Sequence, residues 1–164
     1  MTVLGIDPGS AATGYGIINM QNRHLICVSF GVIRTQQKKN LAEKLRKIYC
    51  SLDELICKYN PDHIALEDVF FGQNIQSALK LGQARGVAIL AAANNGKPVY
   101  TYAARAVKLA LTGNGGASKE QVQRMIQSTL KFDEPVQPLD ASDALAIAVC
   151  HARRRETDEL FSKL

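Results

Sequence analysis

The sequence has little of several features that would place it in a common class. Its four cysteines form no C-x-x-C pair, the spacing typical of zinc and thiol redox sites. They are Cys27, Cys50, Cys57 and Cys150, and we expect buried free thiols in a reducing cytosol. The longest apolar run, residues 87–93, is far too short to cross a bilayer. An acid already at Asp7 leaves no room for a signal peptide. The sequence therefore predicts a cytoplasmic protein without a membrane span.

Acidic residues are scarce in one segment, residues 69–132, where Glu120 stands against eight basic residues. The eight are Lys80, Arg85, Lys97, Arg105, Lys108, Lys119, Arg124 and Lys131. The whole chain carries a net charge of +5, and such segregation indicates a polyanionic partner such as nucleic acid. For any single one of these side chains an ordinary solvated helix face is the favoured explanation, whereas the segment as a whole favours nucleic acid. Lys119 follows a glycine-rich loop at a helix start, where backbone amides could meet a phosphate.

What is present in the sequence is the pattern of one α/β domain. The chain has 164 residues, 46% hydrophobic and 21% charged, which suffices for one proper core. We expect the domain to cover residues 1–155 and a frayed charged tail to cover 156–164.

The order of the expected elements predicts a mixed five-stranded sheet flanked by helices. Three β-type runs with short turns predict an antiparallel meander. A helix with three-four apolar spacing follows, and Asn40 with Glu43 forms a capping box at its start. The strand directly after that helix indicates a parallel crossover. The expected strands are residues 3–7, 14–18, 24–33, 63–67 and 99–102, and the expected helices are 40–59, 74–95, 103–111, 118–132 and 140–154.

The second long helix, residues 74–95, contains Gly82, Gly86 and many alanines. Small residues permit close approach of another backbone. Two interpretations are evenly balanced: tight packing on the domain's own sheet, or a subunit interface.

Four acids form the strongest functional pattern. Asp7 and Glu67 end two expected strands, and Asp140 and Asp143 begin an apolar helix. Ends of parallel strands cluster at one edge of a sheet, so the four carboxylates could share one cleft. Hard cations such as Mg²⁺ prefer carboxylate oxygens, and two ions about 3.5–4 Å apart can activate a water and stabilise a leaving oxygen. Each acid alone has an ordinary explanation as a turn former, a solvated strand end or a helix-dipole partner.

Two local choices remain beside this pattern. Strand alternation places Glu67 and Asp68 on opposite faces, and we expect Glu67 to face the site because Ala65 on its side is small. Phe70 follows in an expected loop, where it could stack on an unpaired base. The alternative is that Phe70 and Phe71 both pack inward.

At this point the chain resembles the RuvC-type Holliday junction resolvases, which have an RNase H-like fold. The matching segments are Gly5-Ile6-Asp7-Pro8-Gly9 with Thr13-Gly14-Tyr15-Gly16, Glu67-Asp68-Val69-Phe70, residues 78–86, and residues 140–146. The resemblance covers essentially the whole chain, and the central and final segments are its specific part.

The resemblance implies a homodimer that nicks a four-way DNA junction symmetrically during recombination and repair, with the RuvA–RuvB branch-migration complex as partner. It implies that Asp7, Glu67, Asp140 and Asp143 are catalytic and bind Mg²⁺, two ions per subunit, with Mn²⁺ as a substitute. It also implies catalytic roles for Lys108 and Lys119. Together with the basic segment, the resemblance gives Phe70, Lys80, Arg85, Lys108 and Lys119 as the expected DNA-binding residues.

Three other functions compete with this one. An actin-like ATPase shares the Ile-Asp-x-Gly hairpin but needs two such domains. A related nuclease on RNA or another branched DNA would use the same acids. A non-catalytic junction-binding module is disfavoured because all four acids are present.

Overall fold

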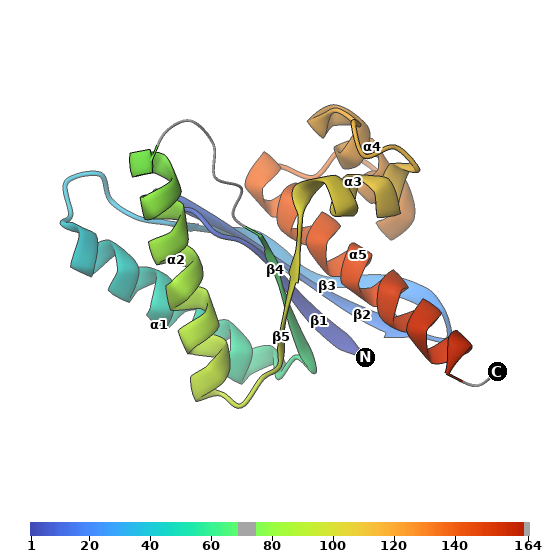
Figure 1. The fold of residues 1–164 in the computed structure, drawn as a ribbon, viewed down its shortest axis with the longest axis horizontal. Coiled ribbons are helices and arrows are strands. Elements are labelled where there is room, and N and C mark those ends of the chain that lie inside the picture. The colour runs from blue at the N-terminus through green and yellow to red at the C-terminus, as the bar shows by residue number, and fades with distance from the viewer. Residues whose placement is uncertain (69–74, 163–164) are drawn as a thin grey trace.

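The computed structural model describes residues 1–68 and 75–162, whose strands form one five-stranded sheet in the order β3-β2-β1-β4-β5 (Figure 1). Strands β1, β2 and β3 are the expected antiparallel meander, and β4 and β5 run parallel to β1. This arrangement confirms the predicted mixed sheet. The strands are β1 Thr2–Asp7, β2 Ala12–Gln21, β3 His24–Arg34, β4 His63–Glu67 and β5 Val99–Tyr102. The helices are α1 Leu41–Tyr59, α2 Ile75–Asn94, α3 Ala104–Thr112, α4 Lys119–Leu130 and α5 Leu139–Phe161.

Helices cover both faces of the sheet (Figure 1). Helices α1 and α2 pack on one face, over the alternate side chains Leu4, Ile6, Ile64 and Leu66. Helix α5, with α3 and α4, covers the other face and packs on Val3, Ile18 and Ala65. The period-two alternation of the strands therefore separates two hydrophobic cores.

Helix α1 forms as its sequence predicts. The Asn40 side chain accepts from the Glu43 amide, and the Glu43 carboxylate accepts from the Asn40 amide. Ile48, Leu52 and Ile56 face the sheet. Cys50 and Cys57 therefore lie on the outer side of this helix and are exposed, so the prediction of buried thiols was wrong for them. All four cysteines are free, and Cys150 alone is fully buried.

Helix α5 lies directly on β1 and β2. A Cβ at Gly5 or Gly14 would overlap the backbone carbonyl oxygen of Ala144 or Asp140. Small residues on both elements thus let α5 approach the sheet closely and fix where its first turn lies.

The C-terminal end of α5 differs from the prediction. The helix does not end near residue 154 but continues to Phe161, into the segment expected to be a frayed tail. Arg23 in the β2–β3 turn pairs with Glu156 at 3.1 Å, and Thr157 bonds the Arg153 carbonyl. These contacts extend the helix past its apolar stretch, which is all that the sequence pattern revealed.

A buried polar cluster connects α5 to β4 and β5. His151 is fully buried and bonds His63 at 2.8 Å and the Tyr102 hydroxyl at 2.6 Å. Both ring nitrogens of His151 thereby have partners, as a buried imidazole requires.

The structure also bears on the membrane question. In residues 1–68 and 75–162, no helix combines the length and apolar character that a bilayer span would need.

Candidate active site

Asp7 and Glu67 end neighbouring parallel strands. The register pairs Ile6 with Leu66, so the following acids lie side by side at the edge of the sheet. Asp7 shares its face with Val3 and Gly5, and Glu67 shares its face with Ala65, which packs under α5. Both carboxylates therefore point to the α5 side, as alternation predicted.

The first turn of α5 lies at this same edge (Figure 1). The turn begins after Pro138 and carries Asp140, and Asp143 follows one turn on. Gly14 touches the backbone at Asp140, which ties this turn to the strand that pairs with β1.

The electrostatics of Asp7 show that all four acids are close together. Burial, followed by the charge and the hydrogen bond of Glu67, raises the pKa of Asp7 to about 8. The charges of Asp143 and Asp140 act in the same direction. A carboxyl group surrounded in this way holds a proton near neutral pH unless a cation replaces it.

Glu67 is the hydrogen-bonded partner of Asp7. Burial raises its pKa, the hydrogen bond from Asp7 lowers it, and the charge of Asp143 raises it again. Lys119 and Lys108 pull the pKa down. The two strand-end carboxyls thus share a proton, and both predicted lysines act electrostatically on the site.

Lys119 makes a direct contact at this edge. Its Nζ lies 2.9 Å from Asp143 Oδ2, and this hydrogen bond and charge raise the pKa of the lysine. Lys119 is in the first turn of α4, where Ser118 and Gln121 form the predicted capping box. The helix start thus holds the lysine against the acids.

In the part of the chain that the structure describes, no three His, Cys, Asp or Glu side chains are arranged to hold a metal ion as they stand. The carboxylates have other partners in this structure. Asp7 and Glu67 are hydrogen-bonded to each other, and Asp143 faces Lys119. The donor set still fits a hard divalent cation, because clustered carboxylates with a raised pKa are what such a cation neutralises.

The other predicted residues lie at different places. Asp68 points to the opposite face and pairs with Arg85 at 3.5 Å. No local sequence signal indicated that this carboxylate would pair with Arg85. Lys80 lies on α2, exposed, beside a hollow that Ser10 and Lys44 also line. Phe70 and Phe71 lie outside the described residues.

Sequence reasoning missed Gly14 as a support of the site. Its signal was the Gly14-Tyr15-Gly16 pattern in a strand, since glycine there marks close backbone approach. Thr13 is a second support of the site that the sequence pattern did not reveal. It is fully buried, and its hydroxyl donates a hydrogen bond to the Gly9 carbonyl at 2.7 Å. That bond closes the turn that follows Asp7.

Comparison with known proteins decides the family. The model of the family described as crossover junction endodeoxyribonuclease RuvC matches residues 3–151. The chain belongs to the RuvC family. The RuvC crossover junction endodeoxyribonuclease of Citrifermentans bemidjiense is 53% identical over 164 residues, covering 100% of this chain and 99% of the relative.

Solved RuvC structures agree with the fold. The Thermus thermophilus RuvC structure has a TM-score of 0.90 at 33% identity and covers 96% of this chain and 97% of its own. The T. thermophilus RuvC in complex with Holliday junction substrate has a TM-score of 0.91 at 33% identity, over 96% of each chain. The RuvC sheet and helices are thus the architecture predicted from the sequence.

Proposed function

We propose that this chain is a crossover junction endodeoxyribonuclease that cuts four-way DNA junctions during recombination and repair. The observation that carries the proposal is the meeting of Asp7, Glu67, Asp140 and Asp143 at one edge of the sheet, beside Lys119. The named relatives are crossover junction endodeoxyribonucleases, and one solved relative holds a Holliday junction substrate.

RuvC proteins are metal-dependent nucleases, and the carboxylate set fits Mg²⁺. Asp7, Glu67, Asp140 and Asp143 would hold two ions per subunit, with Mn²⁺ as a substitute. When bound, such ions supply a nucleophilic hydroxide at neutral pH and offset negative charge on the phosphate. The shared proton of Asp7 and Glu67 must leave before these carboxylates can act as ligands.

The lysines supply the remaining charge. Lys119 is paired with Asp143 in the free protein, and both groups are partly exposed. An incoming phosphate competes for the lysine, so Lys119 can turn from the carboxylate to a phosphoryl oxygen. Lys108, whose charge also lowers the pKa of Glu67, would add a second cation near the cleaved bond. Phe70, Lys80 and Arg85 remain our candidates for DNA contact.

The working unit is proposed to be a homodimer that meets through α2. Its buried alanines, Ala84, Ala88, Ala91 and Ala92, face the protein's own core. Gly82 and Gly86 do not: a Cβ at either position would meet nothing within 4 Å. An exposed row therefore runs along the outer side of α2. We call it the α2 stripe, and it consists of Ile75, Leu79, Gly82, Gly86, Leu90 and Ala93.

This row favours the subunit-interface interpretation over packing on the domain's own sheet. Its spacing of three and four residues is that of one helix face, and apolar residues on an unpaired face fit a second copy. Two copies would present two cleavage sites to a symmetric junction. The proposed setting is the cytoplasm, with the RuvA–RuvB complex as the partner that moves the junction.

The test of this proposal compares Glu67 with Asp68, two adjacent acids that lie on opposite faces of the sheet. A synthetic junction with Mg²⁺ is incubated with wild type, Glu67→Gln and Asp68→Asn. Glu67→Gln should lower the cleavage rate by at least about 10²-fold, because it removes a charge that the reaction needs. Asp68→Asn is the matched control and should stay within about threefold of wild type. Equal loss in both variants would remove the assignment of Glu67 to the site.

A further inference from the structure

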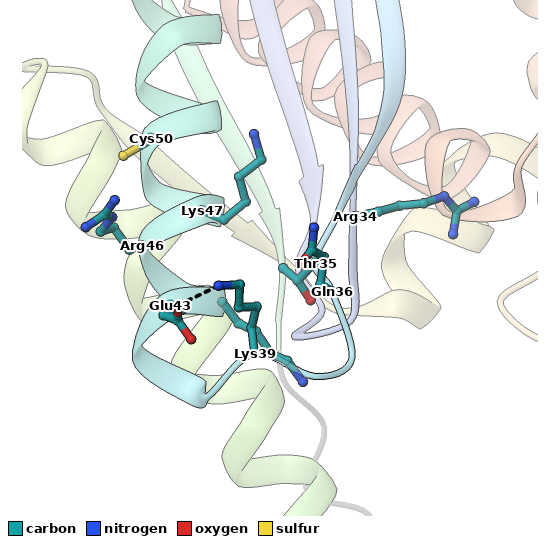
Figure 2. Close-up of a pocket in the computed structure, with 9 residues that line it drawn as sticks. Arg34, Thr35, Gln36, Lys39, Glu43, Arg46, Lys47 and Cys50 are labelled. Atoms are coloured by element: carbon teal, nitrogen blue, oxygen red, sulfur yellow. Dashed lines mark hydrogen bonds and ion pairs between the residues drawn. The ribbon is translucent and has the colours of Figure 1, made fainter.

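A basic hollow lies on the α1 side of the sheet, at the same end of the strands as Asp7. It occupies about 410 Å³ between the loop after β3 and the first turns of α1 (Figure 2). Five of its nine lining residues are basic and one is acidic. The basic ones are Arg34, Lys39, Lys44, Arg46 and Lys47. The acid, Glu43, is already paired with Lys39 at 2.9 Å and bonded to the Asn40 amide.

The charges of this hollow are spread out rather than convergent. Figure 2 shows Arg34 and Arg46 extending in opposite directions, with Lys39 and Lys47 between them. A small anion needs donors that converge on one point. A row of separate cations instead fits a row of separate anions, as on a phosphate backbone.

A second hollow continues the first. It has a volume of about 380 Å³ and contains Lys44, which also lines the first hollow, and Lys80 of α2. Ser10, in the turn after Asp7, lies on its wall. The two hollows therefore form one path from Arg34 across the start of α1 to α2.

Direct hydrogen bonds connect this path to the turn that follows Asp7. The Thr35 hydroxyl donates to the Ser10 carbonyl at 2.7 Å, and the Thr35 amide donates to the Ala11 carbonyl at 3.0 Å. Ser10 follows Asp7 by three residues, which span at most about 11 Å. A nucleic acid held at Asp7 would thus reach the first cation within a few nucleotides.

We propose that Arg34, Lys39, Lys44, Lys47 and Lys80 form a track, called here the arm track, that holds the phosphate backbone of one duplex arm of the junction. This inference rests on the proposed function, because it names the substrate part that leaves the cleavage site. The arm track adds affinity without reading sequence, as phosphate contacts do.

DNA is favoured over an acidic protein surface by the lining of the hollow. Protein interfaces have an apolar centre, whereas the first hollow has no large apolar side chain among its lining residues. Its continuity with the edge that carries Asp7 also fits the substrate itself.

The test compares two triple variants that lose equal charge. The arm-track variant carries Lys39→Gln, Lys44→Gln and Lys47→Gln. The control carries Arg23→Gln, Lys58→Gln and Arg154→Gln, which lie on the β2–β3 turn and the last parts of α1 and α5, toward the opposite end of the sheet. Binding is measured without divalent metal to junctions with arms of about 20 base pairs and of about 6 base pairs, two turns against about half a turn.

The arm-track variant should bind the long-armed junction about 10- to 100-fold more weakly near 0.1 M salt. Its slope of log affinity against log salt should be shallower by about 2 to 3, as expected for three lost phosphate contacts. On short arms the loss should be clearly smaller, because about 6 base pairs reach only the first cations of the arm track. An equal loss in the control, an equal loss on short arms, or unchanged binding, as an acidic protein partner would leave it, each overturns the arm track.

Cleavage with Mg²⁺ in the same preparations separates this inference from the proposed function. If wild type cleaves and the arm-track variant binds normally, the arm track is overturned and the proposed function stands. If wild type does not cleave while the arm-track variant still binds long arms weakly, the proposed function fails and the arm track stands.

Discussion

At the residue scale, burial decides the chemistry of Asp7. Its pKa of about 8 lies far above the ordinary 3.8, so between these pH values the folded protein holds a proton that the unfolded chain releases. Stability therefore falls as pH rises across this window. In metal-free protein, the free energy of unfolding should decrease from about pH 6.5 to about pH 8, where no opposing contribution from His151 remains. Asp7→Asn should reduce this decrease and be the more stable protein at pH 8. Parallel curves for the two proteins in urea denaturation would contradict the account of Asp7.

Under the proposed function, Lys119 competes with metal for Asp143, with which it forms an ion pair. Lys119→Gln removes that competitor, so metal affinity should rise about 3- to 10-fold, as expected for a partly exposed ion pair. The cleavage rate at saturating metal should nevertheless fall about 10- to 100-fold, because a cation at the phosphate is lost. Calorimetric titration and single-turnover cleavage measure the two effects. Arg124→Gln, exposed on the same helix, is the control and should change neither. A loss of metal affinity in Lys119→Gln would show that the lysine supports the ligands instead.

His151 acts on stability in the opposite direction to Asp7. Burial, followed by the charge of His63, lowers the pKa of His151 to about 4 from 6.5. The unfolded chain therefore binds a proton below pH 6.5 that the folded protein refuses. As the pH falls from about 6.5 to 4, the free energy of unfolding therefore decreases by about 3 kcal/mol, as expected for a pKa shift of this size.

The contribution of His151 is best measured where Asp7 does not oppose it. The free energy of unfolding is compared at pH 7 and pH 4 in Asp7→Asn and in Asp7→Asn with His151→Gln. The first should lose clearly more stability on acidification than the second. Equal losses would mean that His151 is not held neutral by its surroundings.

At the element scale, the α2 stripe has the sharpest consequence. Gly86 faces open space, so Gly86→Leu fits the isolated subunit and removes a helix-weakening glycine, which costs about 1 kcal/mol in a helix interior. The same side chain would block a second copy. We expect Gly86→Leu to be monomeric in sedimentation analysis while it unfolds at the same or a higher temperature.

Gln76→Leu supplies the control for this change. It adds the same side chain at an exposed position of α2 outside the α2 stripe and should remain dimeric. A dimeric Gly86→Leu would place the interface elsewhere.

Local signals explain which elements could be predicted from the sequence. Helix α1 was predictable because its capping box and apolar spacing agree. The meeting of Asp7 and Glu67 was predictable because both acids end strands joined by a parallel crossover. The extension of α5 was not, because it depends on the pairing of Arg23 with Glu156, far apart in the chain. The pairing of Asp68 with Arg85 was not predictable either, because it is also a tertiary contact. The exposure of Cys50 was not predictable because it depends on which side of α1 meets the sheet.

At the scale of the whole molecule, clustered acids and basic side chains meet at one edge of the sheet. Acids from β1, β4 and α5 come together because a parallel pair of strands and a closely packed helix end there. Basic side chains lie on both sides of this edge: Lys119 on the α5 side, and the proposed arm track on the α1 side. This division fits a site that holds metal at its centre and draws in a polyanion from around it.

The most direct measurement compares cleavage of three substrates of matched sequence by the wild-type protein with Mg²⁺. These are a four-way DNA junction, a linear duplex and an RNA–DNA hybrid. We expect paired nicks in the junction at a rate at least about 10²-fold above the other two, and loss of these nicks in Asp7→Asn. Equal cleavage of the duplex or the hybrid, or full activity in Asp7→Asn, would contradict it.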